Sequence, residues 1–256
     1  MIFSKYSANG NDFIIVKDPE RDLSAFIIEK MCDRHFGIGA DGVLYLLKSD
    51  KADARMRIFN SDGGEAEMCA NGLRAMVHYW DSLQNVKKPS YKIETMNGIY
   101  EVFCTNGKVQ IEMSEISQEN LHPAPELHLF EKSFFINTGV PHLVLLGPNK
   151  DIAIKEIGSQ YRFHKNFPKG TNVNFVEVKS GDTQEAYVRT YERGVEDETF
   201  SCGTGLTATA LALSHWFGWK GLIKLSNKGG NQEVLIGDKV LYSGEITFCF
   251  QGEYTL

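Results

Sequence analysis

The sequence predicts a mixed α/β fold made of two structurally similar halves. Short segments of alternating apolar and polar residues, typical of strands, are interleaved with a few longer segments that have helical periodicity. In addition, the motif Cys-Ala-Asn-Gly-Leu-Arg-Ala that begins at Cys69 returns about half the chain later, from Cys202, as Cys-Gly-Thr-Gly-Leu-Thr-Ala. A repeat on this scale indicates duplicated structural units.

Two further pairs of segments repeat at nearly the same offset. A strand-like segment precedes each cysteine, Arg57 to Asn60 in the first copy and Arg189 to Glu192 in the second. The stretch from Phe3 to Val16 resembles that from Phe135 to Leu146, since both end in an apolar run after a glycine-containing loop. The second copy has one extra residue before its cysteine, which we expect to lengthen a loop around Val195 to Glu198.

The individual elements follow from periodicity. We expect helices over Ser24 to His35, Gly72 to Trp80 and Gly205 to Trp216, the last two starting just after the paired cysteines. Alternation predicts strands over Lys92 to Thr95, Val109 to Met113 and Asn172 to Val178.

The segment Gly37 to Gly42 fits the glycine pattern of dinucleotide-binding loops, G-x-G-x-x-G. That pattern requires a strand before it and a helix after it. Here a helical stretch precedes it and the strand-like Val43 to Leu47 follows, so we interpret it as a turn.

The halves are expected to meet in the polar stretch Ser114 to His128, which contains Pro123 and Pro125. This gives an N-terminal half over residues 1–116 with Cys69 and a C-terminal half over 117–245 with Cys202. The last strand, at about 246–256, is a candidate to return to the first half.

Composition narrows the functional classes. The 256 residues carry a net charge of −6, which gives no electrostatic reason to expect nucleic acid or an anionic membrane as partner. No signal peptide and no membrane-spanning run are predicted. The five scattered cysteines form no Cys-x-x-Cys pair and suit reduced thiols in the cytoplasm. No histidine lies at metal-ligand spacing from them, so no metal site is predicted.

Cys69 and Cys202 are the candidate catalytic residues. Each lies where a loop meets a helix, and the N–H groups of a helix start bind anions and favour the thiolate. Two such thiols suit inversion at one carbon, since one takes a proton from one face while the other donates a proton to the opposite face. A single free cysteine is more often structural, and we assign that role to Cys32, Cys104 and Cys249.

At these motifs the chain resembles the diaminopimelate epimerase family. The matching segments occur in the family's order along nearly the whole chain. They are Gly10 to Phe13, Asp33 to Gly42, Phe59 to Gly63, Glu67 to Gly72, Pro141-His142, Phe167-Pro168, Asn172-Val173, Tyr191 to Gly194 and Glu198 to Gly205.

The resemblance implies two pseudo-symmetric halves, each a curved mixed or antiparallel sheet around a central helix. It implies a homodimeric cytoplasmic enzyme without cofactor that interconverts LL- and meso-diaminopimelate for lysine biosynthesis. Cys69 and Cys202 match its acid–base pair, and His142 and Glu192 match residues that support the proton transfers. The substrate-binding positions match Asn11, Asn60, Ala70, Asn71, Asn172, Glu192, Arg193, Gly203 and Thr204.

Two departures from the family pattern keep other functions open. Val140 stands where the family has an asparagine before Pro-His, and Ala70 replaces the glycine that follows the first cysteine. A related racemase acting on a different amino acid is therefore an alternative. A thiol redox or regulatory protein is a further one, but it gives the asparagine, glutamate and arginine motifs no task.

Overall fold

The computed structural model describes residues 1–19, 22–105, 107–113, 116, 121–123, 130–149, 151–181 and 183–255. The chain divides into two compact units, unit 1 with Met1–Glu112 and Ser243–Leu256, and unit 2 with Met113–Tyr242. The expected linker, Ser114 to His128, lies largely outside the described residues. Along the part of the chain that the structure describes, no helix has both the length and the apolar character needed to span a membrane.

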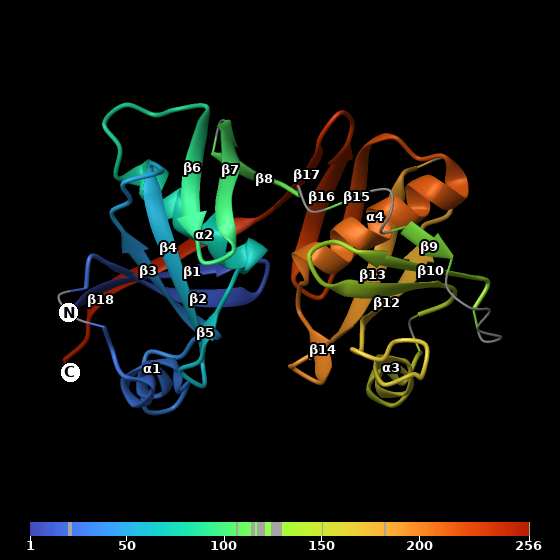
Figure 1. Cartoon of the computed structure of the whole chain (residues 1–256), viewed down its shortest axis with the longest axis horizontal. Coiled ribbons are helices and arrows are strands. Elements are labelled where there is room, and N and C mark those ends of the chain that lie inside the picture. Colours follow the sequence, from blue (N-terminus) through green and yellow to red (C-terminus); the bar gives the residue numbers. More distant parts are fainter. Residues whose placement is uncertain are drawn as a thin grey trace. The chain divides into compact units, whose positions relative to one another are not determined.

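Unit 1 is a strongly bent sheet that encloses one helix (Figure 1). Strands β1 and β2 form a hairpin, β3 runs parallel to β2, β4 is antiparallel to β3, and β6 is parallel to β4. The last strand, β18, pairs with β1. The strands are β1 (Ile2–Ala8), β2 (Asn11–Lys17), β3 (Gly42–Leu47), β4 (Ala54–Asn60), β5 (Glu65–Ala66), β6 (Ser90–Thr95), β7 (Gly98–Thr105), β8 (Lys108–Glu112) and β18 (Ile246–Glu253); the helices are α1 (Ala25–Cys32) and α2 (Ala70–Ser82).

Unit 2 repeats this connectivity strand by strand. The hairpin β10–β11 is followed by β12 parallel to β11, β13 antiparallel to β12, and β15 parallel to β13, while β9 pairs with β10 as β18 does with β1. The strands are β9 (Leu121–Pro123), β10 (Lys132–Asn137), β11 (Pro141–Leu146), β12 (Asn172–Val178), β13 (Glu185–Glu192), β14 (Asp197–Thr199), β15 (Gly221–Asn227), β16 (Gly230–Ile236) and β17 (Val240–Gly244); the helices are α3 (Ile154–Arg162) and α4 (Gly203–Phe217).

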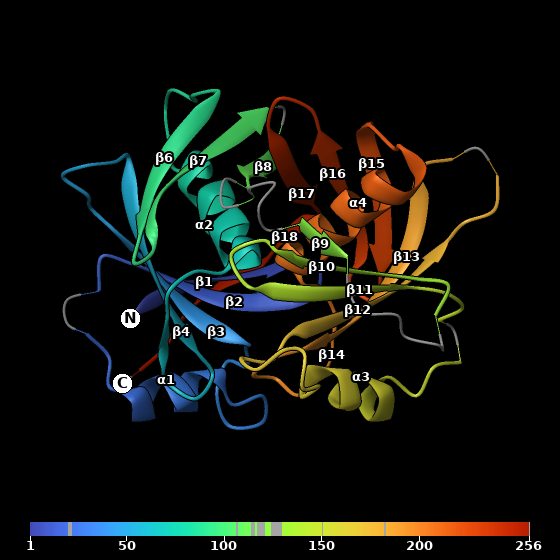
Figure 2. The ribbon, with the colours of Figure 1, turned by 45° about the vertical axis from the view of Figure 1, so that its right-hand side comes forward.

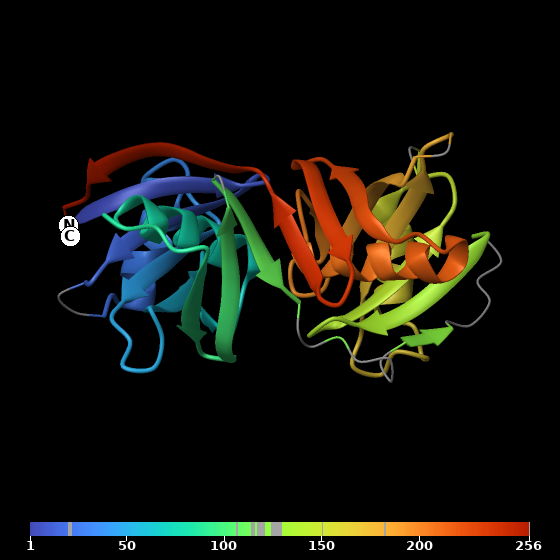
Figure 3. The ribbon, with the colours of Figure 1, turned by 90° about the horizontal axis from the view of Figure 1, so that it is seen from above.

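Each unit packs its core on both faces of its sheet, with the central helix on one face and α1 (unit 1) or α3 (unit 2) on the other. In unit 1, α2 contacts β1, β2, β3, β4, β7, β8 and β18, and Figure 2 shows these strands around it. In unit 2, α4 contacts β10, β11, β12, β13, β15 and β16. Figure 3 shows α4 beside the strands of unit 2, seen from above. Burial on nearly all sides explains why both helices are apolar or small in their first turns. The predicted α/β fold of two similar halves is confirmed.

The helix ends differ from the predicted ones for local reasons. Both central helices begin two residues before the predicted starts, because Cys69 and Cys202 themselves occupy the N-cap positions. Helix α1 ends before the predicted His35, since Asp33 is extended and its carboxylate accepts the N–H groups of His35 and Phe36. Gly37 to Gly42 is, as predicted, the connection from a helix to a strand.

The extra residue of the second copy lengthens a turn, as expected. Five residues, 60–64, separate the paired Phe59 and Glu65 in the β4–β5 hairpin. Six residues, 192–197, separate the paired Tyr191 and Glu198 in the β13–β14 hairpin. The turn places Glu196 at φ 58°, in the left-handed region that side chains other than glycine seldom adopt.

Candidate active site

Cys69 caps the central helix of unit 1. Its backbone is extended, at φ −143° and ψ 119°, and its Sγ accepts the N–H of Gly72 at 3.4 Å. The side chain is half-buried, whereas Ala70 and Asn71 behind it are buried. The sulfur therefore lies at the positive end of α2, in contact with one of the backbone donors that a helix start leaves without an intrahelical acceptor.

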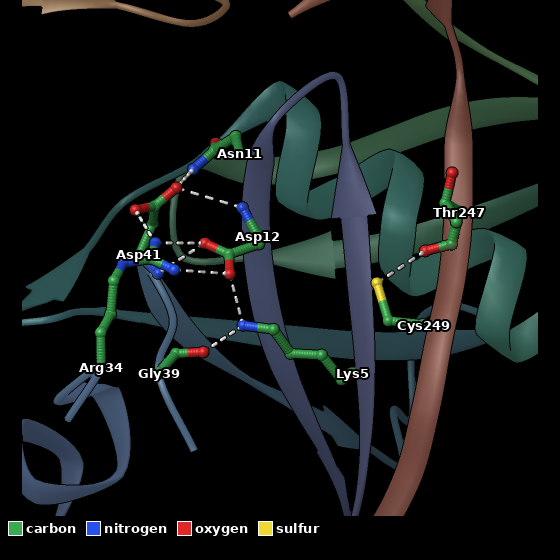
Figure 4. A network of polar contacts seen from close by, with 8 residues as sticks. All are labelled: Lys5, Asn11, Asp12, Arg34, Gly39, Asp41, Thr247 and Cys249. Atoms are coloured by element: carbon green, nitrogen blue, oxygen red, sulfur yellow. Dashed lines mark hydrogen bonds and ion pairs between the residues drawn. The ribbon is translucent and has the colours of Figure 1, made fainter. Parts of the chain in front are cut away.

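Asn11, the first residue of β2, brings a second polar group to Cys69. Its Oδ1 lies 3.7 Å from the Cys69 Sγ and 3.5 Å from the Asn71 Nδ2, and accepts from both. Its Nδ2 donates to the Asp41 Oδ2 at 2.9 Å (Figure 4). Three of the predicted site residues of unit 1 thus meet at one point, while Asn60 lies exposed at the end of β4.

A network of charged groups continues from Asp41 (Figure 4). Arg34 donates from Nη2 to Asp41 at 2.8 Å and to Asp12 at 2.7 Å, and the buried Lys5 ammonium lies 2.5 Å from Asp12. Burial by itself would raise the pKa of Asp12, but hydrogen bonds from Arg34 and Lys5 outweigh it and lower that pKa to about 2. Asp12 therefore stays ionised throughout the neutral range.

Cys202 caps the central helix of unit 2 and is buried. Its sulfur has no helix-start N–H as donor to its side chain, but lies 3.4 Å from the Thr204 Oγ1. The same Oγ1 lies 3.0 Å from the Nε2 of His142, which begins the parallel ladder between β11 and β12. Thr204 is thus the bridge between the imidazole and the thiol.

The direction of this chain of hydrogen bonds follows from Asn174. Its Nδ2 faces the Leu143 carbonyl at 3.2 Å, which only accepts, so the nitrogen is identified by its partner. The same Nδ2 lies 3.1 Å from the His142 Nδ1, which must then accept. A neutral His142 accordingly carries its proton on Nε2 and donates it to Thr204, whose hydroxyl hydrogen is available to Cys202.

The buried imidazole is neutral at physiological pH. Desolvation is the main cause that lowers the pKa of His142, to about 3, and the positive charge of Arg193 adds to it. The hydrogen bond with Asn174 acts in the opposite direction and is smaller. A fixed neutral tautomer, rather than an imidazolium, therefore faces Thr204.

The remaining predicted residues of unit 2 lie at the adjoining strand ends. Asn172 uses both ends of its amide on backbone, donating to the Pro141 carbonyl at 2.9 Å and accepting the Arg193 N–H at 2.7 Å. Arg193 donates from Nη1 to the Lys169 carbonyl at 3.3 Å. Burial raises the pKa of Glu192, and the nearby Thr199 side chain lowers it in part. Asn172 thus holds the turn that carries Glu192 and Arg193.

Close packing against α4 keeps the imidazole in place. A Cβ on Gly205 would lie 2.4 Å from the Asn174 Oδ1 and 3.3 Å from the His142 Cε1. The absence of a side chain at Gly205 is what lets β11 and β12 approach the first turn of α4. Thr138 ties the preceding turn to the same helix, because its Oγ1 donates to the Thr204 carbonyl at 3.0 Å.

Several polar residues of these clusters were not predicted as site residues, among them Asp41, Asn174 and Arg74, whose Nη2 donates to the Asn71 Oδ1 at 2.9 Å. Asn174 has one signal that could have found it, since asparagine is disfavoured inside a strand and here shares a face with Asn172. Arg74 follows Asn71 by three residues on α2, a spacing at which helix side chains meet. Asp41 is exposed and carries no comparable signal.

No group of three or more His, Cys, Asp or Glu side chains among the described residues is arranged to hold a metal ion. The polar groups at the two cysteines are amides, hydroxyls and an imidazole. Their chemistry is that of proton transfer and of hydrogen bonding to a polar ligand.

Comparison with known proteins identifies relatives over nearly the full chain. The sequence profile of diaminopimelate epimerase matches residues 3–118 and 134–242. The diaminopimelate epimerase of Methanothrix thermoacetophila is 39% identical and covers 96% of this chain and 94% of its own length. That of Aquifex aeolicus is 38% identical, with 98% and 97% covered.

Solved structures share the fold at low sequence identity. A putative phenazine biosynthesis PhzC/PhzF protein from Clostridium difficile superposes with a TM-score of 0.73 at 15% identity, covering both chains completely. A hydroxyproline epimerase from Agrobacterium vitis, with bound trans-4-hydroxy-L-proline, gives a TM-score of 0.64 at 15% identity over 98% of this chain and 91% of its own. At this identity the likeness concerns the fold.

Proposed function

This chain belongs to the diaminopimelate epimerase family, and we propose that it interconverts LL- and meso-diaminopimelate, an isomerase reaction of lysine biosynthesis that needs no cofactor. The observation that carries the proposal is that each unit presents a cysteine at the N-cap of its central helix. The near-complete match to named epimerases supports the choice of substrate.

We assign the two proton transfers to Cys69 and Cys202. One thiolate takes the α-proton of the substrate, the C–H electron pair passes toward the α-carboxylate, and the other thiol gives its proton to the opposite face of the carbon. Each turnover therefore leaves the protonation states of the two sulfurs exchanged. The N–H groups of a helix start stabilise the charge that develops on the carboxylate.

The polar neighbours of Cys202 support its role as the base when the substrate arrives. The sequence of donors from Asn174 through His142 to Thr204 ends in a hydroxyl hydrogen that can be donated to the sulfur. Donation to the sulfur favours the thiolate. His142 acts here as a positioning residue that directs the Thr204 hydroxyl and does not itself take the proton.

We propose that the distal amino-acid head of the substrate binds to the polar residues of the family motifs. The Arg193 guanidinium and asparagine amides suit its carboxylate, and the Glu192 carboxylate suits its ammonium. The proposed set comprises Asn11, Asn60, Ala70, Asn71, Asn172, Glu192, Arg193, Gly203 and Thr204, with Ala70 and Gly203 contributing backbone N–H groups.

We further propose a homodimer in the cytoplasm. Strand β18 exposes Phe248 and Phe250, which are 50% and 46% accessible, and the neighbouring β1 exposes Ile2 at 66%. Apolar side chains exposed on this pair of strands are a candidate interface with a second copy. A reducing compartment is proposed because acid–base chemistry by cysteine requires that both thiols stay reduced.

Deuterium exchange tests the reaction and the substrate together. Purified protein is incubated in deuterated water with LL-diaminopimelate and, separately, with a panel of other amino acids. We expect α-deuterium to appear in both LL- and meso-diaminopimelate. Exchange only in a panel member would reject this substrate and favour a racemase of another amino acid, the alternative that Val140 and Ala70 keep open.

Serine substitutions test the roles of the two cysteines. Cys69→Ser and Cys202→Ser should each abolish epimerisation, because a serine hydroxyl is a far weaker acid than a thiol and its alkoxide is not available near neutral pH. Cys104→Ser, on β7, is the matched control, because Cys104 is half-buried like Cys69. Undiminished epimerisation in either of the first two variants would contradict the assignment.

A further inference from the structure

We propose that Asp41 is a positioning residue that fixes the Asn11 side-chain amide with its carbonyl toward Cys69, so that Cys69 rests as the thiol. This inference rests on the proposed function, in which Cys69 is one of the two groups that exchange protons with the substrate. Asp41 itself contacts neither the sulfur nor, in the proposed site, the substrate.

The Asp41 carboxylate decides which end of the amide faces it. An ionised carboxylate only accepts hydrogen bonds, so the Asn11 atom 2.9 Å away must be the NH₂ group. The backbone N–H of Asp12 donates to the same Oδ2 at 3.1 Å, and Arg34 donates to Oδ1 at 2.8 Å (Figure 4). These donors hold the carboxylate in place, and the Asn11 carbonyl is left pointing at Cys69.

A second anchor, independent of Asp41, gives the same orientation. The buried Arg74 donates from Nη2 to the Asn71 Oδ1 at 2.9 Å and to the Asn9 Oδ1 at 3.0 Å. A guanidinium only donates, so Asn71 must turn its NH₂ group toward Asn11, and that group lies 3.5 Å from the Asn11 Oδ1. The orientation of the Asn11 amide is therefore fixed on one side by the Asp41 carboxylate and on the other by the Arg74 guanidinium, acting through Asn71.

The consequence for Cys69 is opposite to that for Cys202. A carbonyl at 3.7 Å can only accept from the Cys69 sulfur, which requires the S–H proton to be present. This contact favours the thiol and opposes the Gly72 N–H, which donates to the same sulfur at 3.4 Å and does not depend on Asp41, whereas the Thr204 hydroxyl favours the thiolate at Cys202. Two sulfurs with similar helix positions are thereby prepared for different first roles, acid at Cys69 and base at Cys202.

The test measures the pH dependence of alkylation at Cys69 by iodoacetamide, with the adduct at each cysteine quantified by mass spectrometry. Asp41→Leu removes the charge and the acceptor with little change of size. Asp41→Asn removes the charge but keeps an oxygen. That oxygen can still accept hydrogen bonds from the Asp12 N–H and the Asn11 amide, while Arg34, which is more than half exposed, can bind water instead. Free N-acetylcysteine, alkylated in parallel, controls for the pH dependence of the reagent itself.

We expect the midpoint for Cys69 to move to lower pH by about half a unit to one unit in Asp41→Leu, the scale of one hydrogen bond. The long 3.5 Å contact with Asn71 that remains is too weak to hold the Asn11 amide alone, so the amide can turn its NH₂ group to the sulfur. The midpoint in Asp41→Asn and that of the free-thiol control should stay where they are. Equal shifts in both Asp41 variants would reveal a simple charge effect, and no shift in Asp41→Leu would show that Asp41 does not orient the amide. Either result overturns the proposal.

Thermal unfolding and the exchange assay complete the design. Asp41 is exposed, so the leucine variant should unfold within a few degrees of the wild type; if it does not, Asp41→Ala replaces it in the same comparison. Alkylation does not depend on turnover. If wild-type protein fails to exchange the α-proton of diaminopimelate, the proposed function fails, while the Cys69 profile still decides the role of Asp41.

Discussion

Replacing Thr204 by valine tests whether a hydroxyl directed by His142 stabilises the Cys202 thiolate. Valine matches threonine in shape but cannot bridge the Nε2 at 3.0 Å and the sulfur at 3.4 Å. A hydrogen bond to a charged group contributes about 1.5–3 kcal/mol. Because sulfur is a weak acceptor, we take about 1.5 kcal/mol, which corresponds to about one pH unit.

The acid limb of kcat/KM for epimerisation should therefore move to higher pH by about one unit in Thr204→Val. Below that limb the variant should be about tenfold slower than the wild type, and at high pH the difference should narrow. The α-proton exchange rate measured from pH 5 to pH 10 gives both values. Thr204→Ser keeps the hydroxyl and should keep the limb in place.

Thr207→Val controls for the loss of a buried hydroxyl on the same helix. The Thr207 Oγ1 donates to the Gly203 carbonyl at 2.9 Å and has no contact with the relay. We expect this variant to lose some stability without any displacement of the acid limb. If Thr204→Val and Thr204→Ser give the same pH profile, or if the valine variant keeps the wild-type limb, the reasoning about Cys202 is refuted.

Three further predictions concern other parts of the molecule. The folded-state pKa of His142 is about 3, below its unfolded value. Its contribution to the free energy of unfolding should therefore be complete above about pH 6.5 and fall by up to about 1.4 kcal/mol per pH unit toward pH 3. Thermal melts of the wild type and of His142→Gln should differ in this slope. Gly205→Ala should cost about 1–3 kcal/mol in urea unfolding and slow α-proton exchange, because the new Cβ would displace Asn174; an unchanged rate would contradict this. Phe250→Glu should yield monomers by light scattering if β18 forms the dimer interface, and an unchanged mass would exclude that face.

The duplicated architecture was predictable because the sequence repeats its chemistry at both cysteines. The strand segments Lys92 to Thr95 and Asn172 to Val178 carry a clear alternation, and the structure places strands there. Helix α3 was missed for identifiable reasons. Its N-cap residue, Ala153, offers no side-chain hydrogen bond, and Gly158 interrupts its interior. That glycine is required by packing, since a Cβ there would lie 2.6 Å from the Tyr191 side chain.

The residues of the candidate site also fall into two groups, those recognisable from local sequence motifs and those whose role depends on the fold. Cys69, Cys202, Asn11 and Asn71 stand in motifs whose spacing is local, so the sequence could identify them. The orienting groups could not be identified in that way. Asp41 acts on Asn11, which is 30 residues away, and Arg74 joins its near neighbour Asn71 to Asn9, which is 65 residues away. The direction of these hydrogen bonds depends on which donor faces which acceptor, and only the folded chain brings these partners together.

The first hairpins of the two units, β1–β2 and β10–β11, differ at one position near the cysteines of the proposed site. Gly10 and Gly139 both have positive φ, and Asn11 follows the first while Val140 follows the second. An ancestral half-length chain that paired with itself would have carried the same residue at both places. When both copies lie on one polypeptide, each can mutate independently. The two cysteines can then have different polar neighbours and different resting protonation states, which two identical chains related by symmetry could not provide.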